Sequence, residues 1–148
     1  FMANYSDGLT DVDLDDMIER FEESGKICCF LAVRPPLTYH LAEIDGNGRV
    51  AAFRTSDRSD IWINGGYFLF RPQIFDYMRP GEELVIEPFN RLIAENKLMA
   101  YKHEGFWRSM DTLRDWQALE DMVEKGQTPW KVPAREQQVD IPLSMVIQ

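Results

Sequence analysis

The chain has 148 residues and a formal net charge of −9, because 25 acidic side chains outnumber 16 basic ones. The length suits a single domain with a buried core, and 45% hydrophobic with 28% charged residues is typical of a globular protein and not of a disordered one. The negative charge disfavours nucleic acid and anionic membrane surfaces, which select basic proteins. No apolar run approaches the roughly 20 residues of a membrane-spanning helix. On these two grounds, the charge and the lack of an apolar run, neither nucleic acid nor a membrane is an expected partner.

The beginning of the chain predicts a strand, a helix and a second strand. Residues 1–5 are apolar and lead into a polar turn, which indicates the end of a buried strand. Residues 13–23 carry apolar side chains at helical spacing, and Gly25 follows as a candidate cap for the end of this helix. Residues 27–33 form a continuous apolar run, as expected for a strand that is covered on both faces of a sheet.

A hairpin and a long strand are predicted next. Residues 39–44 and 49–53 flank Asp45-Gly46-Asn47-Gly48, which is a strong turn signal between two strands. Residues 54–60 are polar and predict a loop. Residues 61–70 predict a further strand, which is interrupted by a pair of glycines.

The remaining elements are mostly helical. Residues 72–78 predict a short helix that begins with proline, residues 87–96 a second helix and residues 112–125 a third. Residues 98–101 predict a short strand, and residues 127–148 a proline-containing tail. This order of strands and helices predicts an α/β fold with a mixed sheet.

Cys28 and Cys29 are adjacent in the predicted central strand. Neighbouring side chains of a strand point to opposite faces, so a disulfide between these two is not expected. We interpret both as small buried hydrophobic residues in a reducing compartment, which predicts a cytoplasmic location.

Polar and glycine residues at three places are candidates for a functional site. Asp7 follows the first strand, where open α/β sheets bind ligands, and a carboxylate there suits Mg²⁺, although an Asx turn explains it equally well. Gly65 and Gly66 after Asn64 indicate either close approach of a ligand or tight packing within the sheet. Asp111 precedes the last helix, either as its N-cap or as a second metal carboxylate.

Several short segments occur along the chain in a recognisable order, and together they span residues 1 to about 131. They are residues 5–13 (YSDGLTDVD), 63–68 (INGGYF), 87–88 (EP), 98–101 (LMAY), 105–107 (GFW), 110–115 (MDTLRD) and 129–131 (PWK). In this order and spacing they resemble the sugar-1-phosphate nucleotidyltransferases, most closely the glucose-1-phosphate cytidylyltransferases.

The resemblance implies a Rossmann-like α/β domain with a mixed sheet flanked by helices. Residues 1–126 would be the C-terminal part of the catalytic domain, and residues 127–148 a C-terminal tail. The implied reaction joins a sugar-1-phosphate to the α-phosphorus of a nucleoside triphosphate, with CTP the expected one, and releases pyrophosphate. Asp7 and Asp111 would be the catalytic carboxylates that hold Mg²⁺, and Asn64 would contact a sugar hydroxyl.

Further substrate contacts are implied at Gly8, Gly65 and Glu87. The family's glycine-rich triphosphate loop is absent from this chain. The family's lysine for the sugar phosphate is also missing from the loop before the Asn-Gly-Gly strand, which leaves Arg54 and Arg58 as candidates.

The resemblance also implies a homo-oligomer. The substituted loop leaves open an alternative in which the domain is a non-catalytic binding or assembly module that keeps the fold. A metal-dependent glycosyltransferase of related fold is a weaker third possibility.

Overall fold

The structure is a computed structural model that describes residues 1–35, 40–55 and 61–131. Arg58 and residues 132–148 of the predicted tail therefore lie outside the described residues. The strands are β1 (Met2–Asn4), β2 (Gly8–Thr10), β3 (Cys28–Val33), β4 (His40–Ile44), β5 (Val50–Thr55), β6 (Ile63–Phe70), β7 (Leu98–His103) and β8 (Trp107–Ser109). The helices are α1 (Leu14–Ser24), the 3-10 helix η2 (Pro72–Tyr77), α2 (Glu87–Ala94) and α3 (Leu113–Glu124).

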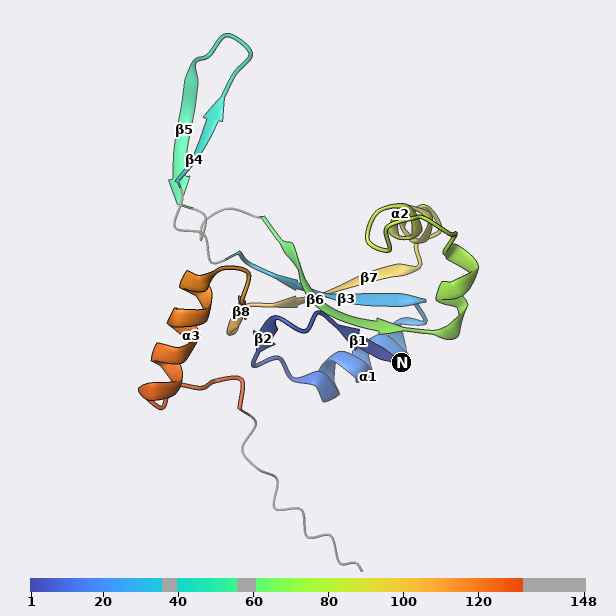
Figure 1. Cartoon of the computed structure of the whole chain (residues 1–148). Coiled ribbons are helices and arrows are strands. Elements are labelled where there is room, and N and C mark those ends of the chain that lie inside the picture. The colour runs from blue at the N-terminus through green and yellow to red at the C-terminus, as the bar shows by residue number, and fades with distance from the viewer. Residues whose placement is uncertain (36–39, 56–60, 132–148) are drawn as a thin grey trace, which may run out of the picture.

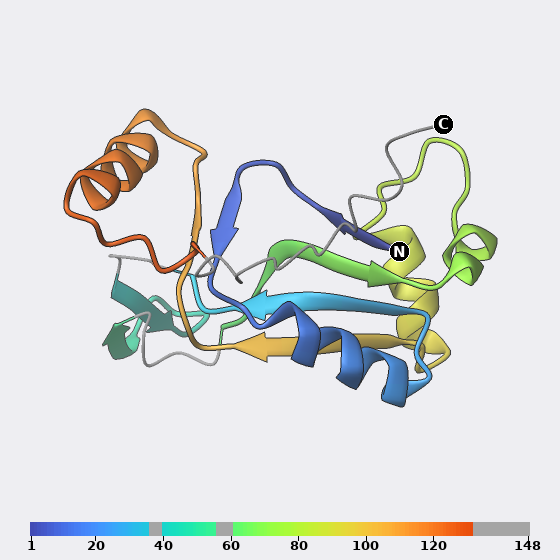
Figure 2. The same ribbon diagram turned by 90° about the horizontal axis from the view of Figure 1, so that it is seen from below.

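A mixed sheet with the strand order β1-β6-β3-β7 forms the centre of the molecule (Figure 1). β3 pairs parallel with β7 and antiparallel with β6, and β6 pairs antiparallel with β1. α1 lies on one face of this sheet and α2 on the other, as the two views together show (Figures 1 and 2). The predicted α/β fold with a mixed sheet flanked by helices is confirmed.

The core occupies both faces of β3. On the α1 face it comprises Val12, Met17, Phe21, Cys29, Leu31, Val33 and Leu69. On the α2 face it comprises Ile27, Cys28, Phe68, Phe70, Ile74, Phe89 and Leu92. The two adjacent cysteines thus point to opposite faces, as predicted, and both are free thiols.

Both thiols are expected to resist alkylation in the folded protein. Their exposed fraction is 0%, and burial raises the pKa of Cys29 to about 11 and that of Cys28 further still. Because the thiolate is the reactive form, iodoacetamide at pH 8 should leave both unmodified while it alkylates both rapidly in urea. Mass spectrometry over time measures this. Equal rates with and without urea would contradict the buried position of β3.

The first strand is less buried than its sequence predicts. Phe1 and Met2 are 59% and 51% exposed, and all three residues of β1 are exposed. β1 pairs with β6 along one side, and no other described strand lies along its outer side. An apolar sequence favours burial, but burial also needs a covering layer, and among the described residues β1 has none. The prediction of a buried strand was therefore wrong.

Two helices bury less of their apolar face than their sequences suggest. In α2, Phe89 and Leu92 are buried, but Ile93, four residues after Phe89 and on the same side of the helix, is 60% exposed. In α3, Leu119 is buried while Leu113 is 69% exposed. α3 stands beside the end of the sheet and not over a face of it (Figure 1). Among the described residues, no helix has the length and apolarity that a bilayer crossing requires.

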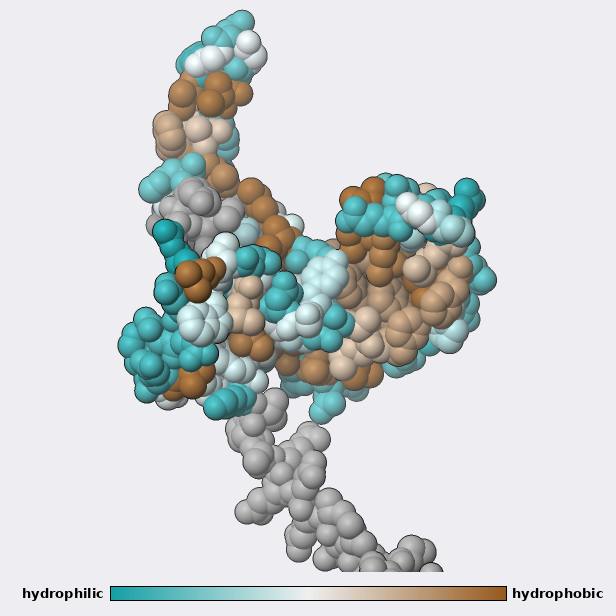
Figure 3. Space-filling model, viewed as in Figure 1, coloured by the Kyte–Doolittle hydropathy of each residue, from teal (hydrophilic) through white to brown (hydrophobic). Residues whose placement is uncertain are grey.

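β4 and β5 form the predicted hairpin, and it projects from the body as an arm (Figure 1). Asp45 Oδ1 accepts hydrogen bonds from the backbone N–H groups of Asn47 and Arg49, at 2.9 Å each, which fixes the turn. The surface is hollowed between this arm and α2 (Figure 3). The hollow lies on the same side of the sheet as α2 (Figures 1 and 3).

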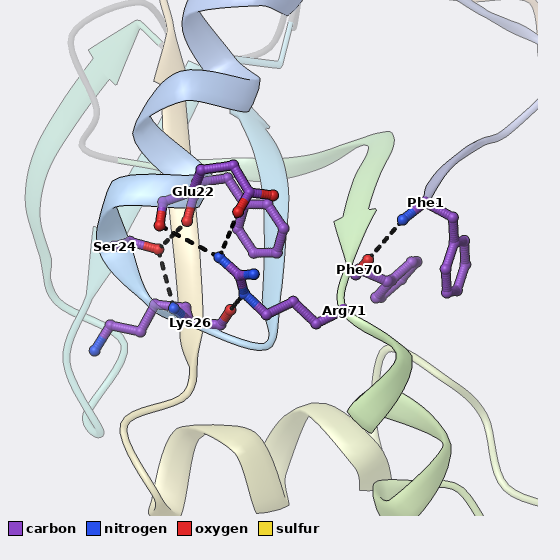
Figure 4. Close-up of polar contacts among 7 residues, drawn as sticks. Phe1, Glu22, Ser24, Lys26, Phe70 and Arg71 are labelled. Carbon is purple, nitrogen blue, oxygen red and sulfur yellow. Dashed lines mark hydrogen bonds and ion pairs between the residues drawn. The ribbon is translucent and has the colours of Figure 1, made fainter.

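Arg71 joins the end of β6 to the last turn of α1 (Figure 4). Its guanidinium donates to the Lys26 carbonyl at 2.9 Å and to the Glu22 carboxylate at 2.8 Å. The backbone nitrogen of Phe1 donates to the carbonyl of Phe70 at 2.8 Å on the neighbouring strand. These contacts supply partners for groups that a helix end and a strand end otherwise leave to water.

Candidate functional site

β2 and β8 form an antiparallel ribbon beside the start of β6. Gly8 pairs with Ser109, and the Met110 N–H donates to the Asp7 carbonyl at 2.9 Å. Neither strand was predicted, since strands of three residues beside turns carry too little periodicity to be recognised. The ribbon brings the backbone of Asp7 beside the segment that leads to Asp111.

A cavity of about 260 Å³ opens where this ribbon meets β6. Asp7, Asp111 and Asn64 line it together with Gly8 and Gly65. The structure therefore brings together residues from three distant segments of the chain that the resemblance assigns to one site. Their roles in that site stay predictions.

Asp111 is free of the capping role that its sequence position allows. Thr112 is the N-cap of α3: its hydroxyl accepts from the Asp115 N–H at 3.2 Å, and the Asp115 carboxylate accepts from the Thr112 N–H at 3.0 Å. The Asp111 carboxylate accepts instead from the Ser109 hydroxyl at 2.6 Å. The N-cap interpretation of Asp111 was therefore wrong, and its exposed carboxylate lines the cavity.

Separate variants distinguish these two neighbours. Thr112→Ala should lower the free energy of unfolding by about 1 kcal/mol, because it removes the cap of α3. Asp111→Ala should change it by less than about 0.5 kcal/mol, because Asp111 is exposed and caps no helix. Urea unfolding followed by circular dichroism measures both. A larger loss in Asp111→Ala than in Thr112→Ala would contradict the assignment of the cap.

The paired glycines are required by packing inside the protein. A Cβ at Gly65 would lie 3.2 Å from the Leu31 carbonyl oxygen. Gly66 has φ +77°, and a Cβ there would lie 2.7 Å from the ring of Tyr5. The Gly66 N–H donates to the Asn64 side-chain oxygen at 2.9 Å. Tight packing therefore explains both glycines, and Gly65 also lines the cavity.

Two aromatic side chains fix the backbone around the cavity. The Trp107 indole N–H donates to the Gly65 carbonyl at 2.8 Å, and the Tyr67 hydroxyl donates to the Gly8 carbonyl at 2.8 Å. Burial raises the pKa of Tyr67, so its hydroxyl remains a donor across the neutral range. Both bonds tie the ribbon to β6 and hold the cavity walls in place.

Four residues that line the cavity have no individual role predicted from the sequence. They are Tyr5, Ile63, Trp107 and Ser109. Tyr5 was included in a buried strand, yet it is 48% exposed. Trp107, Arg108 and Ser109 alternate as residues of a strand do, but a segment of three residues is too short to predict a strand from its sequence alone.

Other predicted contact residues do not line the cavity. The carboxylate of Glu87, at the start of α2, accepts from the Glu83 N–H at 3.0 Å. Arg54 lies on the arm, where its guanidinium is 3.0 Å from the Glu43 carboxylate. Arg58 lies outside the described residues. The structure thus joins neither Glu87 nor Arg54 to the cavity.

The oxygen donors of the cavity suit a hard divalent cation. Asp7 and Asp111 supply two carboxylates, and Ser109 adds a hydroxyl. Within the described ranges, no group of three or more His, Cys, Asp or Glu side chains gathers at one point. Mg²⁺ needs no such group, because it is held by one or two carboxylates with waters and substrate phosphates. The residues present fit Mg²⁺.

Comparison with known proteins agrees with the fold and with the resemblance. No protein-family model matches the chain. It is 36% identical over 133 residues to the glucose-1-phosphate cytidylyltransferase of Salmonella typhi, which covers 88% of this chain and 51% of that protein. The resemblance to the sugar-1-phosphate nucleotidyltransferases is confirmed. The chain spans about half the length of the curated relatives it matches.

More distant nucleotidyltransferases share the similarity. The chain is 23% identical to the UTP–glucose-1-phosphate uridylyltransferase of Synechocystis, over 92% of this chain and 38% of that protein. A solved structure from Bacillus anthracis, assigned as a glucose-1-phosphate thymidylyltransferase, superposes with a TM-score of 0.58 at 14% identity. This covers 82% of this chain and 53% of that one, and it shows the shared fold.

Proposed function

We propose that this chain is part of a sugar-1-phosphate nucleotidyltransferase that uses CTP. The observation that carries the proposal is the cavity, because it joins the two carboxylates of Asp7 and Asp111 to the amide of Asn64. The names of the relatives support the reaction class, and the cytidylyltransferases among them support CTP. A homo-oligomeric assembly and a cytoplasmic location are part of this proposal.

The proposed reaction is an in-line substitution at phosphorus. A phosphate oxygen of the sugar-1-phosphate forms a bond to the α-phosphorus of the triphosphate, the bond from that phosphorus to the bridging oxygen breaks, and pyrophosphate leaves with the electron pair. Such a reaction needs positioning and charge neutralisation more than a covalent nucleophile. Mg²⁺ held by Asp7 and Asp111 would neutralise charge on the phosphate oxygens.

The residues around the cavity would position the sugar. Asn64 presents an amide beside the hydroxyl of Tyr5, at 3.5 Å, so both can contact sugar hydroxyls from one side. Its side-chain oxygen is held by the Gly66 N–H, which fixes the orientation of the amide. The ring of Trp107 supplies an apolar wall whose position is fixed by its bond to Gly65.

The test is an assay of the protein expressed from its whole reading frame, with its intact mass measured first. CTP, UTP, GTP or dTTP is incubated with glucose-1-phosphate and Mg²⁺, and pyrophosphate and the nucleotide-sugar are quantified by chromatography. We expect CDP-glucose as the main product and its loss on chelation of the metal. Pyrophosphate-free mixtures with all four nucleotides would overturn the proposal and favour a non-catalytic module.

A further inference from the structure

Two cationic side chains lie against one tryptophan at the end of the sheet. The Arg34 guanidinium carbon is 4.7 Å from the centre of the Trp62 ring, and the Lys102 ammonium is 4.9 Å from it. Arg34 directly follows β3, Trp62 directly precedes β6 and Lys102 belongs to β7. The Glu104 carboxylate lies 3.8 Å from the Arg34 guanidinium, so two cations and one carboxylate meet at this end of the sheet and leave it a net positive charge.

The pairing of the strands places this cluster beside Asn64. Ala32 of β3 pairs with Lys102 on one side and with Asn64 on the other, so the three residues form one row across the sheet. Side chains of paired residues point to the same face, and two strand spacings put Asn64 and Lys102 about 10 Å apart.

That row lies on the α2 face of the sheet. Side chains alternate between the two faces along a strand, so Ala32 points to the same face as Cys28, four residues earlier in β3. Cys28 packs in the core on the α2 face. The hollow between the arm and α2 opens over this face (Figure 3). A ligand that contacts Asn64 on this face can therefore extend toward Lys102.

The chemistry of the cluster suits a phosphoryl group. An arginine fork matches the geometry of phosphate oxygens, and a lysine adds a mobile point charge. Contact with the indole holds both side chains, which lowers the entropic cost of ordering them around an anion. Lys102 is exposed, and the Arg34 side chain is 34% exposed, so a ligand can reach both.

The proposed substrates carry negatively charged phosphoryl groups, so binding them requires positively charged side chains near the cavity. The described residues that line the cavity include carboxylates but no Lys or Arg side chain. Arg54, a candidate for the phosphate from the sequence, lies on the arm in β5 and does not line the cavity.

We infer that Arg34, Trp62 and Lys102 form an anion site that binds the phosphoryl group of a phosphate ester, in the same row as Asn64. The inference rests on the proposed function for its substrate class, because a phosphorylated sugar would reach from Asn64 to this cluster. A sugar-1-phosphate, a nucleoside triphosphate and free phosphate share the chemistry that the cluster recognises.

The test uses the protein from its whole reading frame, labelled with 5-fluorotryptophan, without metal and without turnover. The fluorine resonance of Trp62 is assigned by Trp62→Phe and followed during titration with glucose-1-phosphate, CTP, inorganic phosphate or glucose. We expect a saturable shift with the phosphorylated ligands and none with glucose. The ligand with the lowest dissociation constant identifies the source of the phosphoryl group.

Variants of each cation decide whether this cluster is responsible. Arg34→Gln and Lys102→Gln should each raise the dissociation constant about 10-fold, as expected for loss of one charged hydrogen bond. Lys125→Gln removes a surface cation on α3 and should leave binding unchanged. Unchanged fluorine spectra of the other tryptophans show that each variant is folded. Absence of a Trp62 shift with every phosphorylated ligand, or equal effects of all three variants, would overturn the inference.

The result is separable from the test of the proposed function. Phosphate binding at Trp62 in a protein that makes no nucleotide-sugar would keep the anion site and remove the proposed reaction. Synthesis of a nucleotide-sugar at full rate and affinity by both Arg34→Gln and Lys102→Gln would keep the reaction and remove the anion site from it.

Discussion

Replacing Asp7 or Asp111 by Asn is expected to slow nucleotide-sugar formation by about 10²- to 10³-fold. The amide keeps the size of the side chain but removes the negative charge that would hold Mg²⁺ in the cavity. Loss of about 3 to 4 kcal/mol of transition-state stabilisation corresponds to that change in rate. The rate of pyrophosphate release at saturating CTP and glucose-1-phosphate measures it.

A matched variant separates a role in the cavity from a general loss of acidic charge. Asp121→Asn changes an exposed carboxylate of α3 that lies 3.9 Å from the Lys125 ammonium, and it should leave the rate unchanged. Unfolding midpoints of all three variants should stay close to that of the parent protein. Parental rates in either Asp7→Asn or Asp111→Asn would refute the assignment of these carboxylates.

Elements with strong local signals were predictable from the sequence. The carboxylate of Asp13 caps α1 by accepting from two N–H groups of its first turn, and Gly25 ends the helix with φ +62°. The apolar run of β3 is buried on both faces, as its composition predicts. In each of these cases the deciding interactions lie within a few residues along the chain, so the sequence pattern reports them directly.

Features that depend on distant pairing were not predictable in this way. β2 and β8 are strands because they pair with each other, and neither has a pattern of its own. Asp7 and Asp111 were singled out separately on local grounds, and the family resemblance alone linked them. The exposure of β1 likewise depends on what lies beside it in space, which apolar composition does not report.

Packing rather than a ligand accounts for the second glycine of the Asn-Gly-Gly segment, and Gly66→Ala tests this. The variant should lower the free energy of unfolding by about 2 to 5 kcal/mol. Left-handed backbone costs an L-residue about 1 to 2 kcal/mol, and φ is +77° at Gly66. The methyl group would also lie 2.7 Å from the Tyr5 ring, and relief of such overpacking costs about 1 to 3 kcal/mol.

Gly81→Ala is the matched control for the backbone contribution. Its φ is +83°, but nothing lies within 4 Å of the added methyl group, so only the backbone cost of about 1 to 2 kcal/mol should remain. In the Tyr5→Ala background the ring is absent, and the cost of Gly66→Ala should fall toward that of Gly81→Ala. Urea unfolding of the four variants measures these differences. If Gly66→Ala costs no more than Gly81→Ala with the ring in place, packing does not require Gly66. Close approach of a ligand then becomes the better explanation for a glycine beside Asn64.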